Sequence, residues 1–267
     1  MRLTIRHTTE YAYDGPVGYG LSRIRMTPRD STVQRVLGWT VTAEGAVIDF
    51  SYDDAFGNRV TFARTGTVTD RLALHAEGEV ETFDTHGILG RHLGHAPLRL
   101  LTRPTALTQP GDRIADLAAR VTETTDLGRL HQLSALVGEA VRWTTETTDV
   151  ATSAEEALGH GTGVCQDQAH VFCAAARMLG FPARYVGGYF AMDEAHQAAG
   201  HAWAEAHVEG LGWVGFDIAN AVCPDERHLR IATGRDYGDA APVTGMRYGT
   251  ARETMDVSVT VMTQQQQ

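Results

Sequence analysis

The sequence predicts an α+β fold, with an antiparallel, sandwich-like β domain over residues 1–100 and a helix-and-sheet domain over 101–267. Two patterns predict this division. Apolar and polar residues alternate through much of the first hundred residues, as strands with one buried face require. Beyond residue 111, apolar residues recur at three- and four-residue spacing, the period of a helix with one buried face. The chain has 267 residues and 43% hydrophobic content, enough for a substantial core.

The first hundred residues contain several short runs in which every second residue is apolar. These runs predict strands around residues 3–5, 37–41, 60–62 and 72–74. The pairs Gly57-Asn58 and Thr69-Asp70 are turn signals between them. The following segment, 88–111, is rich in glycine and proline, so we expect an irregular linker there.

The second half predicts two helices followed by strands. Leucines and valines at helical spacing give the first helix one apolar face, at Leu127, Leu130, Leu133, Val137 and Val141. The helix that starts at Cys165 is apolar on almost every side, which is typical of a central helix. Gly180 and Pro182 are its stop signals. Strands are expected at 184–190, 201–208, 213–218 and 255–262.

Cys165 lies where a thiol gains reactivity. It opens the central helix, whose N-terminus carries about half a positive charge and so favours the thiolate. Gly161 and Gly163 leave the sulfur approachable, because a backbone without Cβ atoms allows a substrate close. His201 and Asp217 follow along the chain. A cysteine, a histidine and an aspartate in this order indicate nucleophilic acyl transfer.

The strand pattern around Gly210 predicts that His201 and Asp217 meet. Directly paired residues project to the same face of a sheet, so matching the aliphatic faces of the two strands requires a loop with an odd number of residues. Loops 209–211 and 210–212 both satisfy this. With the first, His201 lies opposite Ala219 and diagonal to Asp217. A slip of one residue would place the two polar side chains on opposite faces.

Four motifs resemble the transglutaminase-like superfamily: Gly-Val-Cys-Gln-Asp at 163–167, Leu-Gly-Phe-Pro-Ala-Arg-Tyr-Val-Gly-Gly-Tyr at 179–189, His-Ala-Trp-Ala-Glu at 201–205 and Gly-Trp-Val-Gly-Phe-Asp at 212–217. The chain is similar, more narrowly, to bacterial transglutaminase-like proteins that are often described as candidate cysteine proteases. The resemblance implies a papain-like transglutaminase core after a β-rich N-terminal region. The chain departs from the family pattern at Gln168, where an aromatic residue is common, and at Ile218-Ala219, where the family usually reads Pro-Thr.

On this reading Cys165 is the nucleophile, His201 its imidazolium partner and Asp217 the group that orients His201. The Cys165 backbone N–H would be one oxyanion donor, because it lies at the helix start. Trp143 and Gln166 are candidates for the second donor. Trp203 and Asn220 are further pocket candidates, and Asn220 or Glu205 would be the next orienter to test after Asp217.

The expected reaction is acyl transfer or hydrolysis at a carboxamide or peptide bond of a protein or peptide substrate, through a thioester. A hydrolytic cysteine peptidase and a non-catalytic binding scaffold on the same fold are the alternatives. The sequence leaves open the natural substrate, the choice between transamidation and hydrolysis, and the oligomeric state. No cofactor is expected.

Charge and cysteine content set further expectations. A formal net charge of −10 argues against nucleic-acid and anionic-membrane partners. Three cysteines do not suggest a disulfide framework, and Cys173 and Cys223 are expected to be structural. No signal-peptide-like or membrane-spanning run is evident, so a cytoplasmic protein is expected. His86, His92 and His95 match no metal-site spacing, so no metal is expected.

Overall fold

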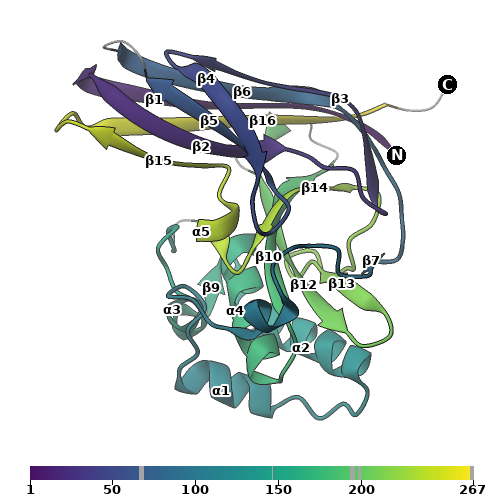
Figure 1. Ribbon diagram of the computed structural model, residues 1–267. Coiled ribbons are helices and arrows are strands. Elements are labelled where there is room, and N and C mark those ends of the chain that lie inside the picture. Colours follow the sequence, from purple (N-terminus) through teal and green to yellow (C-terminus); the bar gives the residue numbers. More distant parts are fainter. Residues whose placement is uncertain (66–68, 146, 193–195, 198–199, 265–267) are drawn as a thin grey trace.

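The computed structural model describes residues 1–267 apart from 66–68, 146, 193–195, 198–199 and 265–267. Strands predominate and helices occupy the middle of the chain, so the predicted α+β class is confirmed (Figure 1). The strands are β1 (Arg2–Val17), β2 (Tyr19–Thr27), β3 (Gln34–Glu44), β4 (Val47–Asp53), β5 (Arg59–Thr65), β6 (Thr69–Thr82), β7 (Ile88–Gly90), β8 (Arg142–Trp143), β9 (Thr162–Gly163), β10 (Ala183–Phe190), β11 (His196–Gln197), β12 (His201–Val208), β13 (Gly212–Phe216), β14 (His228–Gly234), β15 (Val243–Tyr248) and β16 (Glu253–Gln264). The helices are η1 (Leu98–Thr102), α1 (Asp112–Ala119), α2 (Asp126–Ala140), α3 (Ala154–His160), α4 (Cys165–Met178) and α5 (Tyr237–Ala240).

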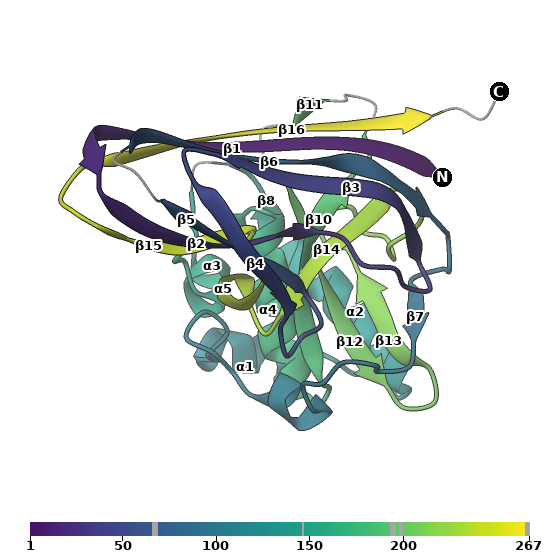
Figure 2. The same cartoon turned by 45° about the horizontal axis from the view of Figure 1, so that its top comes forward.

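Two antiparallel sheets form the upper part of the molecule. The larger has the strand order β11-β16-β1-β6-β3 and the smaller the order β15-β2-β5-β4. Figure 2 shows them as two layers, one above the other. Alternate residues of β6 pack against residues of the smaller sheet, in a cluster formed by Leu72, Leu74 and Ala76 with Ile24, Met26 and Ala63. The alternation seen in the sequence therefore corresponds to one face of β6 buried between the layers.

The larger sheet also covers the helical part of the protein. Leu3, Ile5 and Val80 are fully buried and belong to the same apolar cluster as Phe172 of α4. Leu3 pairs with Val80, so the two residues project to the same face. One apolar face of this sheet therefore packs on the smaller sheet at one end and on the helices and core sheet at the other.

The last two strands of the chain belong to these N-terminal sheets. β16 pairs with β1 from Arg2↔Gln264 to Tyr13↔Glu253, and β15 pairs with β2. The division into 1–100 and 101–267 therefore does not follow the strand partnerships. The alternating pattern of 255–262 correctly predicts a strand, but a local pattern carries no information about which distant strand is its partner.

The core sheet has the order β14-β10-β12-β13-β7, and α4 packs on it. Phe172 of α4 stacks on Phe216 of β13 with ring centroids 5.0 Å apart. The predicted central helix is confirmed, and Gly180 beyond its end has the left-handed φ of 93° that favours glycine. The expected linker at 88–111 is only partly irregular, because its first residues form β7 and pair with β13.

The β12–β13 hairpin has one of the two predicted registers. Val208 pairs with Gly212 and Ala204 with Phe216, which leaves the three-residue loop 209–211. Gly212 has φ 85°, and a Cβ there would lie 2.0 Å from the Gly90 carbonyl oxygen. Glycine is thus required where the hairpin passes β7. The strand ends at Phe216, and Asp217 forms an antiparallel bridge with Val222 across the turn that follows.

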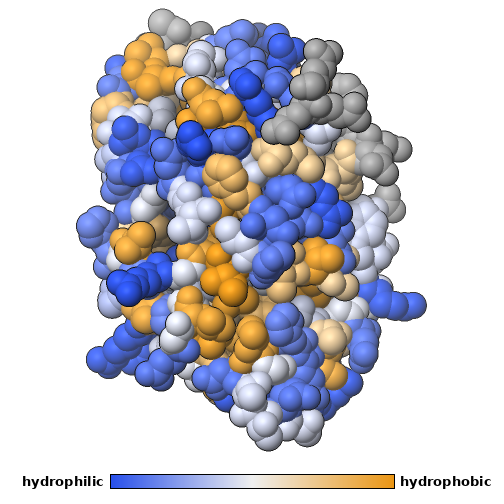
Figure 3. Space-filling view, turned by 90° about the vertical axis from the view of Figure 1, so that its right-hand side faces the viewer, coloured by the Kyte–Doolittle hydropathy of each residue, from blue (hydrophilic) through white to orange (hydrophobic). Residues whose placement is uncertain are grey.

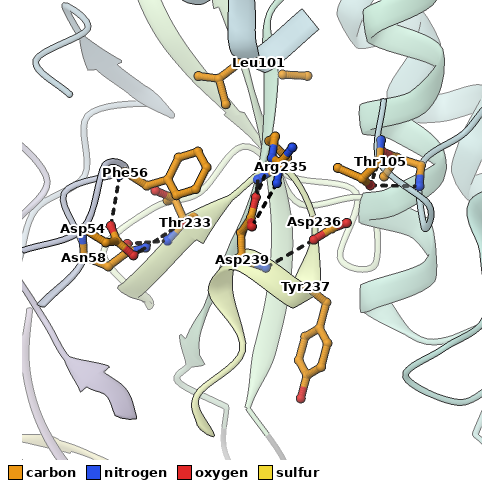
Figure 4. Close-up of polar contacts among 12 residues, drawn as sticks. Asp54, Phe56, Asn58, Leu101, Thr105, Thr233, Arg235, Asp236, Tyr237 and Asp239 are labelled. Carbon is orange, nitrogen blue, oxygen red and sulfur yellow. Dashed lines mark hydrogen bonds and ion pairs between the residues drawn. The ribbon is translucent and has the colours of Figure 1, made fainter. Parts of the chain in front are cut away.

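Two side-chain amides from the N-terminal sheets complete the outer edge of β14. The Asn58 amide donates to Thr233 O at 2.7 Å and accepts from Thr233 N at 2.8 Å (Figure 4). Gln34 makes the same pair of bonds with Arg230, at 2.8 Å and 2.9 Å. These amides take the place of a neighbouring strand, since they satisfy backbone groups that the edge strand would otherwise leave unpaired.

The surface is mixed in character. Figure 3 shows apolar residues in a broken band down the middle of one side, with hydrophilic residues on both flanks. Among the residues that the structure describes, no helix combines the length and the apolar character needed to cross a bilayer.

Candidate active site

The start of α4 is fixed by hydrogen bonds around Asp167. Its Oδ2 accepts from the Val164 backbone N–H at 2.8 Å and from Thr148 Oγ1 at 2.7 Å. A Cβ on Gly163 would lie 2.6 Å from the same oxygen, so the close packing requires glycine. Burial raises the pKa of Asp167, against the effect of these two hydrogen bonds. The carboxylate caps the first turn, as its position in the sequence suggests, and so fixes the direction in which the helix presents Cys165.

Trp143 stands beside this helix start. β8 and β9 are parallel, with Trp143 opposite Gly163, and Thr144 N donates to Gly163 O at 2.8 Å. From the helix side, Gln168 Nε2 donates to Val141 O at 2.8 Å. The Trp143 side chain is 58% exposed, so it remains accessible next to the nucleophile's helix. Gln168, the departure from the family pattern, therefore ties the Trp143 segment to α4.

His201 and Asp217 are in direct contact. His201 Nε2 lies 2.8 Å from Asp217 Oδ2, and because a carboxylate only accepts, the ring nitrogen is the donor. This leaves Nδ1 as the ring nitrogen available to Cys165, the other group that raises the pKa of His201. Burial alone would lower the pKa of His201, but the hydrogen bonds to Asp217 and Cys165 and the charges of both raise it to about 10. The imidazolium form is therefore favoured across neutral pH.

Asp217 is fully buried and receives hydrogen bonds from three side chains. Besides His201, its Oδ2 accepts from Asn220 Nδ2 at 2.7 Å and from His228 Nε2 at 2.9 Å. Burial raises the pKa of this carboxyl, but the hydrogen bonds from the two histidines, the charge of His201 and the bond from Asn220 together hold it well below its usual range. The carboxylate is therefore ionised and fixed in place.

Of the other predicted site residues, Trp203 and Asn220 lie at this cluster. The Trp203 ring is buried and lies 6.0 Å from the His201 ring, so it supports the histidine. Gln166 lies in the first turn of α4 and is half-buried. Glu205 is fully buried and bound by Arg184 and Arg230, which removes it as a candidate orienter for His201.

His228 is the residue that the sequence did not identify. It lies eleven positions after Asp217, at the start of β14, and matches no motif named above. Its side chain is 2% exposed, and its Nε2 reaches the same carboxylate oxygen as His201. The Pro-Asp-Glu-Arg sequence before it indicates only a turn.

His201, Asp217 and His228 each place one possible metal-binding atom within 4.8 Å of the other two. This is the only such group of three among the residues that the structure describes. Both ring nitrogens face one carboxylate oxygen at hydrogen-bond distance, which accounts for the cluster without an ion. His92 is occupied elsewhere: its Nδ1 accepts from Trp213 Nε1 at 3.1 Å, and its Nε2 donates to Ala96 O at 2.8 Å.

The three cysteines have different environments. Cys173 is fully buried in α4, and burial raises its pKa to about 11. Burial also raises the pKa of Cys223. Cys165 is half-buried at the helix start, and its interaction with His201 raises the pKa of that histidine. Cys165 is therefore the thiol with an acid–base partner, as nucleophilic chemistry requires.

Several known proteins are similar to this chain over almost its whole length. An uncharacterized protein of Mycobacterium leprae is 29% identical over 282 residues, covering 97% of this chain and 98% of the relative. One from Mycobacterium tuberculosis is 28% identical over 292 residues, covering 98% and 92%. A Cytophaga hutchinsonii structure, described as that of a candidate cysteine protease, superimposes with a TM-score of 0.76 at 22% identity, over 100% of this chain and 92% of that one. This last match shows a shared fold.

Two family models also match, at separate parts of the chain. Residues 115–218 match the transglutaminase-like superfamily, and residues 3–81 match the bacterial transglutaminase-like N-terminal region. The first match contains Cys165, His201 and Asp217, and the second covers most of the N-terminal strands. Taken together, the two matches show that this chain belongs to the transglutaminase-like superfamily.

Proposed function

We propose that the protein catalyses cysteine-dependent acyl transfer at a carboxamide or peptide bond of a protein or peptide substrate. The observation that carries the proposal is the series of contacts from Cys165 through His201 to Asp217, with the cysteine at a helix start. Membership of the superfamily supports a cysteine-type enzyme. A binding scaffold would not need a buried imidazolium–carboxylate pair beside an accessible thiol.

The first half of the reaction forms a thioester. The Cys165 thiolate attacks the carbonyl carbon of the amide, and the Cys165 N–H at the start of α4 stabilises the negative charge on the oxygen. Trp143 is the preferred second donor, because it pairs with Gly163, two residues before Cys165, and its side chain is exposed. As the C–N bond breaks, His201 Nδ1 gives its proton to the leaving ammonia or amine.

The second half transfers the acyl group. An amine or water attacks the thioester while neutral His201 takes its proton, and the Cys165 thiolate leaves, which restores the ion pair. Transamidation results when an amine reaches the site before water, and hydrolysis when water does. Incubating a glutamine-containing peptide with a primary amine separates the two, since the products differ in mass.

Selective alkylation tests the nucleophile. At a low excess of iodoacetamide we expect Cys165 to be labelled far faster than Cys173 and Cys223, because the first has an activating histidine and burial raises the pKa of the other two. Peptide mapping by mass spectrometry gives the three rates. Cys165→Ala should abolish the fast phase without unfolding the protein. A fast phase at either of the other cysteines would overturn the assignment.

A further inference from the structure

Asp217 is shared by two histidines, and the second one has no part in the reaction proposed above. His228 and His201 both place Nε2 against Oδ2 of Asp217, at 2.9 Å and 2.8 Å. Their ring centroids are 6.1 Å apart. The carboxylate therefore lies between two imidazoles, of which one faces the thiol and the other faces away into the protein.

The other nitrogen of His228 is held by Asp225. The Asp225 backbone N–H and its Oδ1 both lie 3.1 Å from His228 Nδ1. A neutral ring accepts from the N–H, and a protonated ring donates to Oδ1. Asp225 is fixed in turn by Arg227, whose Nη2 donates to Oδ2 at 2.6 Å. In both protonation states, therefore, the hydrogen on Nε2 points to Asp217.

The ring of His228 is also fixed by packing. Phe190 lies 4.7 Å from it and Trp203 lies 5.3 Å from it, measured between ring centroids. The same two side chains pack against His201, at 5.4 Å and 6.0 Å. One pair of aromatic residues thus holds both histidines, and a shift of His228 would be transmitted to the triad.

The position of His228 depends on the N-terminal sheets. It begins β14, whose outer edge is completed by the amides of Gln34 and Asn58. Just before it, the carbonyl oxygen of Glu226 accepts from Thr82 Oγ1 of β6. Behind the ring is a small pocket whose walls include Val33, Phe83 and Leu89 of the N-terminal region together with Trp203, Glu205 and Arg230 of the core.

We propose that His228 is a positioning residue for the triad: its Nε2–H holds the Asp217 carboxylate in the orientation that pairs with His201. The N-terminal sheets act through it, because they fix the strand that carries it. This inference rests on the proposed function, since it assigns a role toward the same Cys165–His201 pair. Without the His228 donor, Asp217 would be freer to turn and more readily protonated. Both changes would weaken its hold on the imidazolium.

Charged and titratable groups face His228 from each element packed against it, namely Asp217 and His201, Asp225 and Arg227, and Glu205 and Arg230. None of them needs to be altered in the test. Asparagine and glutamine at position 228 form a matched pair, because both are neutral amides of different reach. Glutamine extends far enough to replace Nε2 and donate to Asp217, whereas asparagine reaches only the position of Nδ1, near Asp225.

The test is the pH profile of Cys165 alkylation by iodoacetamide in the full chain. We expect the acid limb of the His228→Asn profile to move to higher pH by about one unit. A shift of this size corresponds to the free energy of one lost hydrogen bond to a charged group. His228→Gln should stay close to wild type. His228→Phe, which keeps the ring but has no donor, should follow the asparagine variant. His207→Phe, on the far part of β12, is the control and should leave the profile unchanged.

A merely structural role would lower the melting temperature of these variants without moving the limb. Circular dichroism identifies any variant that does not fold, and the asparagine variant remains informative if phenylalanine is not tolerated. If the acid limbs of the asparagine and phenylalanine variants lay at the wild-type pH or below it, the role of His228 alone would be overturned. Wild-type protein in which Cys165 does not react first would overturn the proposed function, and with it the role of His228.

Discussion

Replacing Asp217 by Asn is expected to lower kcat by about 10²–10⁴ while leaving the fold intact. Asp217 Oδ2 accepts from His201, His228 and Asn220. An amide carries no charge, and its NH₂ would oppose N–H donors. The pKa of His201, which Asp217 helps to raise to about 10, should therefore fall, and the ring should lose its orientation.

Amide turnover by Asp217→Asn, measured once a peptide substrate is in hand, checks this expectation. Asp49→Asn is the matched control, because Asp49 is paired with Arg64 on the N-terminal sheet and should leave turnover unchanged. Activity of Asp217→Asn within about tenfold of wild type would show that the carboxylate is structural. Asn220 would then be the orienter to test, since Glu205 is held by two arginines.

Removing residues 1–110 is expected to leave a chain that aggregates. The deletion takes away β1 and β2, the partners of β16 and β15, so β15 loses its neighbour and β16 keeps only the short β11. It also uncovers the apolar cluster that Leu3, Ile5 and Val80 help to close. Exposed apolar surface and unpaired strand edges both promote association.

Size-exclusion chromatography of the fragment 111–267 measures this outcome, with fragment 111–242 as a comparison. The shorter fragment lacks β15 and β16, so it tests whether unpaired strands alone cause the association. We expect it to aggregate as well, because the core remains uncovered. A soluble 111–267 fragment in which Cys165 is alkylated at the wild-type rate would show instead that the N-terminal sheets are an independent module.

The hairpin of β12 and β13 shows how far a strand register can be predicted from the sequence. Aliphatic residues at even positions in both strands must share the face that packs on α4, and this leaves two possible loops. The structure has one of them, with Val208 opposite Gly212. The paired residues end at Ala204 and Phe216, so this register brings His201 and Asp217 near each other, and the turn after β13 completes their contact.

Other features depend on distant contacts, which local patterns do not encode. β16 pairs with β1 across almost the whole chain, and His228 reaches Asp217 because β14 lies beside β10. The start of α3 does have a local signal, the capping box formed by Ser153 and Glu156. The role of a histidine outside any motif, such as His228, depends on the side chains that surround it in the fold, so the sequence alone does not predict it.

The central claim, that Cys165 and His201 form an ion pair, is tested most directly by alkylation of His201→Ala across pH. The native structure raises the pKa of His201 from 6.5 to about 10, so the imidazolium is stabilised in the folded protein at neutral pH and is lost as pH rises through that value. Wild-type Cys165 should already react fast at pH 6. Without the histidine, the rate should rise steeply only above about pH 8, where an ordinary thiol ionises. Matching profiles for the two proteins would contradict the ion pair and the catalytic role built on it.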